Sequence, residues 1–192
     1  MILSENGPGQ APVPPLDAFK DHLRLAHGFA DDGAEDALLA GYLSAAVAVV
    51  ERRVARALVR RGFTLSVARL ERDGCLVLPI GPVTAVTSAS LEGGGAPVSL
   101  DVSGWSVEPC GTRQQVTASG GALPAIAAGR SMVLSFEAGV AADWAGVPAE
   151  LAQAVMMLAA DFHARRGTER DSEAGLPQAV IALTQAWRPG RL

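Results

Sequence analysis

The spacing of apolar residues changes from a helical period to an alternating one at Gly62, and this change constrains the fold more than any other feature. Before it, residues 34–61 carry apolar side chains every three or four positions, the spacing of one helix face. These are Leu39, Tyr42, Leu43, Val47, Val50, Val54 and Leu58. Acidic residues cluster at the start of the segment and arginines at its end, which suits the helix dipole. We therefore expect a long helix over residues 34–61 that stops at Gly62.

After Gly62 apolar and polar residues alternate, which is the pattern of half-buried strands. Strands are expected at residues 63–70, 75–78, 83–91, 98–100, 105–108, 114–117 and 132–138. Short turns without helices separate them, so the strands should pair antiparallel. The Pro-x-x-Pro stretch from Pro79 to Pro82 is expected to be the corner where the chain leaves the helices for the strands.

The two ends of the chain complete the layout. Residues 1–15 are rich in Gly and Pro and predict an extended or mobile arm. Helical spacing recurs over residues 16–26, 148–166 and 178–187. The chain thus divides into an N-terminal arm (1–15), a first helical part (16–61), a β-module (62–146), a second helical part (147–175) and a C-terminal segment (176–192). We expect an α+β fold, with a bundle of N- and C-terminal helices and an inserted antiparallel β-module.

Composition excludes several classes of protein. A chain of 192 residues with 49% hydrophobic residues can bury a core. Its net charge of −4 argues against a dedicated nucleic-acid binder. The N-terminus lacks a signal-peptide pattern, and the uncharged runs 37–50 and 74–91 are too short or too rich in proline and hydroxyl groups to be membrane helices. We expect the protein to be made and kept in the cytoplasm.

No residue pattern indicates catalysis, a cofactor or a metal. The histidines His22 and His27 lack the i, i+4 spacing of a metal-binding helix, and His163 has no partner by motif. Residues 104–108 miss the last Gly of a nucleophile elbow, and residues 93–95 are no phosphate loop. The two cysteines fit no metal or disulfide framework. We expect a protein that is not an enzyme.

Six short motifs occur in an order that resembles the head–tail connector (adaptor) proteins of tailed phages and gene transfer agents. They lie at residues 19–24, 31–36 (the Asp-rich start of the second helix), 76–86 (Leu-x-Leu-Pro-x-x-Pro-Val-x-x-Val), 147–151, 162–166 (aromatic-His-x-Arg-Arg) and 176–177. The resemblance implies a structural ring, commonly a dodecamer, between the portal and the tail. Such a ring extends the channel through which DNA passes without sequence-specific binding. Its expected partners are the portal protein and a tail stopper or terminator protein, and its final location is the virion.

The resemblance also implies where the contacts lie. The C-terminal segment would dock on the portal through Leu176, Pro177, Trp187, Arg188, Pro189, Arg191 and Leu192. Trp187 would be its anchor, unless it packs on its own helical core. Contacts between ring subunits would use the charged ends of the long helix, namely Asp32, Glu35, Asp36, Arg52, Arg53, Arg56 and Arg60. Alternatively, these arginines would contact the phosphate backbone of DNA instead of a neighbouring subunit. Two other functions remain open, a tail-completion or stopper protein and a small hydrolase with its site in the β-module.

Overall fold

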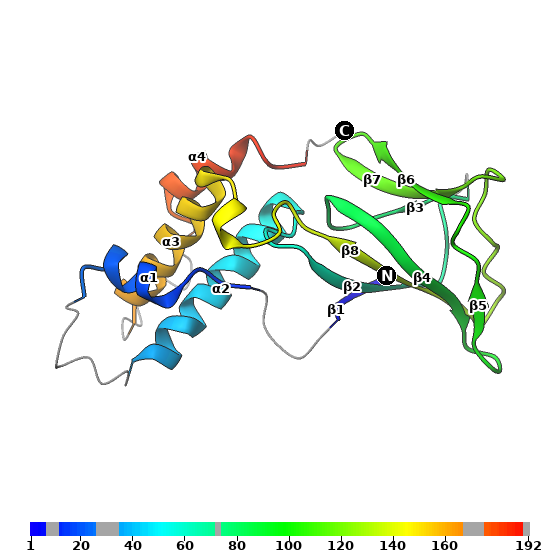
Figure 1. Cartoon of the computed structure of the whole chain (residues 1–192), viewed down its shortest axis with the longest axis horizontal. Coiled ribbons are helices and arrows are strands. Elements are labelled where there is room, and N and C mark those ends of the chain that lie inside the picture. Colours follow the sequence, from blue (N-terminus) through cyan, green and yellow to red (C-terminus); the bar gives the residue numbers. More distant parts are fainter. Residues whose placement is uncertain (7–11, 26–34, 72–73, 167–174, 190–192) are drawn as a thin grey trace. The chain divides into compact units, whose positions relative to one another are not determined.

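The computed structural model describes residues 1–6, 12–25, 35–71, 74–166 and 175–189. The chain forms two compact units, a β-unit of residues 1–8, 55–142 and 189–192, and a helical unit of residues 9–54 and 143–188 (Figure 1). The helical unit therefore joins segments from both ends of the chain, and the β-unit is mostly an insertion between them. This confirms the expected α+β fold. Within the described residues, no helix combines the length and apolarity needed to cross a membrane.

The helical unit contains α1 (Leu16–His22), α2 (Asp36–Val54), α3 (Ala149–Ala164) and α4 (Gln178–Gln185), with a short 3₁₀ turn at Trp144–Gly146 before α3. Helix α2 packs against α3, and α3 packs against α4. Helix α2 buries four of the predicted apolar positions, Leu39, Leu43, Val47 and Val50. Helix α3 buries Leu151, Val155 and Leu158.

The β-unit is built from two antiparallel sheets. The larger sheet has the order β1-β2-β8-β4-β5, with strands Ile2–Glu5, Arg61–Val67, Ser131–Ala138, Val83–Glu92 and Val98–Leu100. The smaller sheet has the order β3-β7-β6, with strands Leu76–Val77, Arg113–Ala118 and Trp105–Cys110. Both sheets contribute to one hydrophobic core, with Leu65, Leu134 and Phe136 from the larger sheet and Leu76 and Val116 from the smaller. The seven strands predicted after Gly62 are all present.

The long helix ends seven residues earlier than predicted, at Val54 instead of Arg61. The next residue, Ala55, has a φ of 53°, in the left-handed region that interrupts a right-handed helix. The backbone N–H of Gly81 donates to the Ala55 carbonyl at 3.2 Å, and that of Ala57 donates to the Gly81 carbonyl at 2.9 Å. Gly81 is thus hydrogen-bonded to the segment that follows α2. Gly62, the predicted helix stop, lies within β2. The chain leaves the helices at Ala55, so the prediction for the Pro79–Pro82 corner was wrong.

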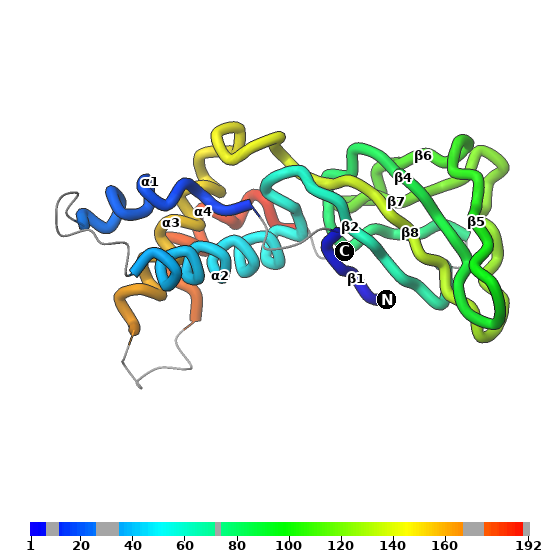
Figure 2. Tube along the Cα trace, turned by 60° about the horizontal axis from the view of Figure 1, so that its bottom comes forward, coloured from blue at the N-terminus to red at the C-terminus, as the bar shows by residue number. Residues whose placement is uncertain are grey.

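The N-terminal arm is also corrected, because its first residues form an edge strand. Strand β1 pairs antiparallel with β2, with Ser4 opposite Thr64 (Figures 1 and 2). An ion pair of 2.7 Å joins Glu5 to Arg61, and the N–H of Asn6 donates to the Gly62 carbonyl at 2.9 Å. These partners lie about sixty residues away in sequence, so the local Gly- and Pro-rich composition did not indicate them. Residues 7–11 lie outside the described part of the chain.

Candidate interaction surfaces

The predicted portal-docking segment is a short helix followed by a half-buried turn. Helix α4 follows Pro177 and buries Val180 and Thr184. After it, Trp187 is half-buried and Arg188 is exposed, and the N–H of Trp187 donates to the Thr184 carbonyl at 3.2 Å. Among the other predicted residues, Leu176, Pro177 and Pro189 are half-buried, and Arg191 and Leu192 lie outside the described residues. The segment therefore presents a partly covered Trp beside an exposed cation, which is an arrangement that suits docking.

One predicted interface residue, Arg53, fixes α4 to α2 within the chain. Its Nε donates to Thr184 Oγ1 at 2.7 Å. The same hydroxyl donates to the Val180 carbonyl at 2.7 Å, within the helix. Because Thr184 is fully buried, this hydrogen bond satisfies a group that water does not reach. In this structure Arg53 holds α4 against α2.

We expect Arg53→Ala to lower the free energy of unfolding by about 1.5–3 kcal/mol, the range for losing a hydrogen bond to a charged group. The matched control is Arg52→Ala, the same change at the neighbouring exposed position of α2, with an expected effect within about 0.5 kcal/mol. Urea denaturation followed by circular dichroism measures both variants. Equal destabilisation of the two would show that the Arg53–Thr184 bond does not stabilise the bundle.

The acidic end of α2 is also partly engaged within the helical unit. Lys20 Nζ lies 2.7 Å from Asp36 Oδ1, and the Lys20 side chain is only 9% exposed. This ion pair joins α1 to the first turn of α2. Glu35 is exposed just before α2, and Asp32 lies outside the described residues. Asp36 therefore has a partner within its own chain. Glu35 is the one predicted acidic interface residue that is described and forms no ion pair with another described residue.

The basic residues predicted at the other end of the helix do not lie on one helix. Arg52 and Arg53 occupy the last turn of α2, but Arg56 and Arg60 follow the helix and belong to the β-unit. The reason is that α2 ends at Val54. Arg60 is exposed, and its N–H donates to the Ala141 carbonyl at 2.7 Å. The prediction that these four arginines lie at the end of one helix was therefore wrong for Arg56 and Arg60.

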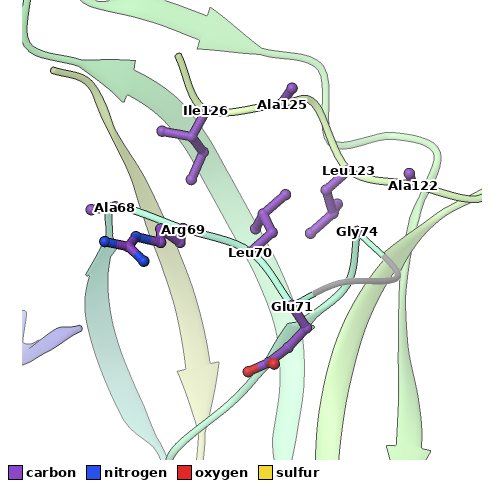
Figure 3. Close-up of a pocket in the computed structure, with 9 residues that line it drawn as sticks. All are labelled: Ala68, Arg69, Leu70, Glu71, Gly74, Ala122, Leu123, Ala125 and Ile126. Carbon is purple, nitrogen blue, oxygen red and sulfur yellow. The ribbon is translucent and has the colours of Figure 1, made fainter. Parts of the chain in front are cut away.

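An open groove of about 460 Å³ lies at one end of the β-unit (Figure 3). Leu70, Leu123 and Ile126 point toward one another across it, and Arg69 and Glu71 point away from them. The other lining residues are Ala68, Gly74, Ala122 and Ala125. Among the described residues that line this groove there is no Ser, Thr, Cys or His, and Glu71 is the one carboxylate.

The remaining polar groups of interest are the possible metal ligands, His163 and Asp101. Across the described residues, no three His, Cys, Asp or Glu side chains gather where they would hold a metal ion. His163 packs edge-on against Tyr42, with ring centroids 6.1 Å apart. The N–H of Ser103 donates to Asp101 and lowers the pKa of this exposed carboxyl. Such a bond stabilises a turn.

Similarity to solved structures extends over the whole chain. A chain in the neck of an empty gene transfer agent (GTA) particle, computed with C6 symmetry, is 39% identical, with a TM-score of 0.85. A chain in the virion of a native GTA particle is 39% identical, with a TM-score of 0.82. A chain in the neck of a native GTA particle, computed with C12 symmetry, is 35% identical, with a TM-score of 0.79. Each match covers 100% of this chain and 97% of the other.

No family model matches the sequence, and no curated protein matches it. The structural matches alone combine whole-length coverage with identities of 35% or more. Two of them come from particle necks and one from a virion, which makes this chain a structural virion component. The chain therefore belongs to the family of neck proteins of gene transfer agent particles.

Proposed function

We propose that this protein is the head–tail adaptor of a phage-like particle, forming a ring between the portal and the tail. The observation that carries the proposal is whole-length similarity to a neck chain from a structure with C12 symmetry. A closed ring of identical subunits needs heterologous contacts and no catalytic site. In this function the ring extends the DNA channel, the subunits are made in the cytoplasm, and a tail stopper or terminator protein binds the far side.

The portal contact is assigned to the C-terminal segment. Helix α4 is held to the bundle through Val180 and Thr184, so it presents its other side and the following turn to a partner. Trp187 and Arg188 both belong to residue types that are enriched at energetically important interface positions. Leu176, Pro177 and Pro189 flank them. In this assignment the bundle is a rigid support for the docking segment.

Only the charged residues that stay exposed are kept as candidates for contacts between ring subunits. Asp36 and Arg53 already have partners in their own chain. Glu35, Arg52 and Arg60 are exposed and are kept as candidates for ion pairs across the ring. Exposed ion pairs are weak individually, so they would select the register of the contact more than its affinity.

Mixing the purified protein with portal rings of the same particle, followed by electron microscopy, tests the proposal. An adaptor adds a ring to the portal. Portal rings that remain bare under assembly conditions contradict the proposal. Binding to isolated tail proteins with no binding to the portal identifies a tail-completion or stopper protein instead.

Trp187→Ala should weaken portal binding at least about 30-fold, the effect of losing a hot spot of 2 kcal/mol. The matched control is Trp144→Ala, the same change at the other half-buried Trp of the helical unit, which should leave the affinity unchanged. Surface plasmon resonance on immobilised portal rings measures the affinity, and thermal unfolding checks both folds. Unchanged binding by folded Trp187→Ala would move the docking site elsewhere.

A further inference from the structure

The outer face of the five-stranded sheet is rich in hydroxyl groups. In β2 and β8, residues alternate between buried apolar side chains that form the core and half-buried residues on the opposite face. The central part of that opposite face, here called the hydroxyl face, spans all five strands. It comprises Ile2, Ser4, Thr64, Ser66, Ser88, Ser90, Ser99, Val133 and Ser135.

The strand register aligns these residues in two rows across the sheet. One row runs Ser4, Thr64, Ser135, Ser88, and the other runs Ile2, Ser66, Val133, Ser90, Ser99. Thr64 Oγ1 lies 3.4 Å from Ser135 Oγ, so hydroxyls of adjacent strands are within reach of each other. Small side chains in aligned rows allow another protein surface to approach the strands closely.

The hydroxyl face contains no charged residue. The nearest charges along the strands are Glu137, opposite Ala85, and Glu92, opposite Ser131, one at each end of the face. The cores of protein interfaces are depleted of charged residues, as this face is. Nucleic acid is a poor occupant, since this face has no Lys or Arg to neutralise phosphates.

Strand β1 adds an exposed apolar margin to the hydroxyl face. Ile2 lies in the second row and is 72% exposed, and Met1 beside it is 69% exposed. Strand β1 is a four-residue edge strand, Ile-Leu-Ser-Glu, and its register with β2 is regular. Exposed apolar side chains that extend an uncharged face suit a contact with another protein surface.

We propose that the hydroxyl face, with the β1 margin, is a contact surface for a second copy of this chain in the ring. The inference rests on the proposed function. A second copy is the chosen occupant because related chains come from necks with C6 and C12 symmetry. In such rings each subunit applies one surface to a different surface of its neighbour. Uncharged hydroxyls suit this contact because they lose less on desolvation than charges and can exchange water for protein partners.

The test uses Ser88→Cys in a Cys110→Ser background, in which the remaining Cys75 is buried. The control is Ser106→Cys, at an exposed position on the outer side of the smaller sheet. Each variant is labelled with a maleimide as the free protein and again after assembly on portal rings. Assembly should slow labelling of Ser88→Cys by about tenfold or more, because interface cores exclude solvent, and leave Ser106→Cys unchanged.

A photo-reactive benzophenone maleimide on Ser88→Cys identifies the occupant. Cross-linked dimers of this chain within the assembled ring support the proposal. A ring whose Ser88→Cys labels as fast as the free protein overturns the inference and leaves the adaptor function standing, as does a cross-link to the portal instead of a second copy. Failure of the parent Cys110→Ser chain to form any ring overturns the adaptor function itself.

Discussion

Phe136→Ala should lower the free energy of unfolding of the β-unit by about 3–5 kcal/mol, the range for truncating a buried Phe. The Phe136 side chain is only 1% exposed, and its ring stacks on that of Phe63 with centroids 5.7 Å apart. These two residues are partners across the β2–β8 pair. Truncation would leave a cavity in the core that the two sheets share, and the rigid sheets can close it only partly.

The matched control is Glu137→Ala at the next residue of the same strand. Glu137 is exposed, so its truncation should change the free energy of unfolding by no more than about 0.5 kcal/mol. Urea denaturation monitored by circular dichroism gives both values. If Phe136→Ala were no more destabilising than Glu137→Ala, the packing of the two sheets described above would be wrong.

The alternation around Phe136 also explains why the strands were predictable from sequence. In residues 131–138 the buried Met132, Leu134, Phe136 and Ala138 alternate with half-buried or exposed residues. A sheet with one face in the core imposes this period of two on its sequence, so the pattern is local and can be read directly. The same reading holds for β2, where Phe63, Leu65 and Val67 face the core.

The features that were not predicted depend on partners distant in sequence. The end of α2 at Val54 depends on hydrogen bonds with Gly81, and no Gly or Pro near Ala55 marks it. Strand β1 exists because β2 offers it an edge. The role of Arg53 follows from Thr184, which is 131 residues away. The helical spacing of apolar residues continues past Val54 to Leu58. Leu58 is buried as part of the β-unit and not on a helix face, so this spacing did not reveal the helix end.

The candidate surfaces also differ in how far the sequence alone revealed them. The C-terminal segment was predicted as the docking site by resemblance alone, and the structure shows that the Arg53–Thr184 hydrogen bond holds its helix on the bundle. The hydroxyl face was visible in sequence only as an uncharged run, residues 74–91. Recognising the face required the strand register, because Ser88 and Ser90 share it with Thr64 and Ser135 from other strands. Charge depletion across a sheet is a property of paired strands and not of any one segment.

Gly139→Ala should destabilise the protein by about 3 kcal/mol or more, or prevent folding, because the new methyl group would overlap with backbone atoms. A Cβ at Gly139 would lie 2.2 Å from Arg60 Cα and 2.3 Å from Arg60 N. This close approach is fixed by hydrogen bonds on both sides. The N–H of Val140 donates to the Ala57 carbonyl at 2.9 Å, and that of Arg60 donates to the Ala141 carbonyl at 2.7 Å.

The control, Gly41→Ala, should have the opposite sign. A Cβ at Gly41, an exposed position inside α2, meets nothing within 4 Å. Alanine there should raise the free energy of unfolding by about 0.5–1 kcal/mol, because it restricts the unfolded chain and favours the helix. Urea midpoints of the two variants give the comparison. A stable Gly139→Ala protein would mean that the segment following α2 does not pack against the end of β8, and the exit of the chain from the helical unit would need another description.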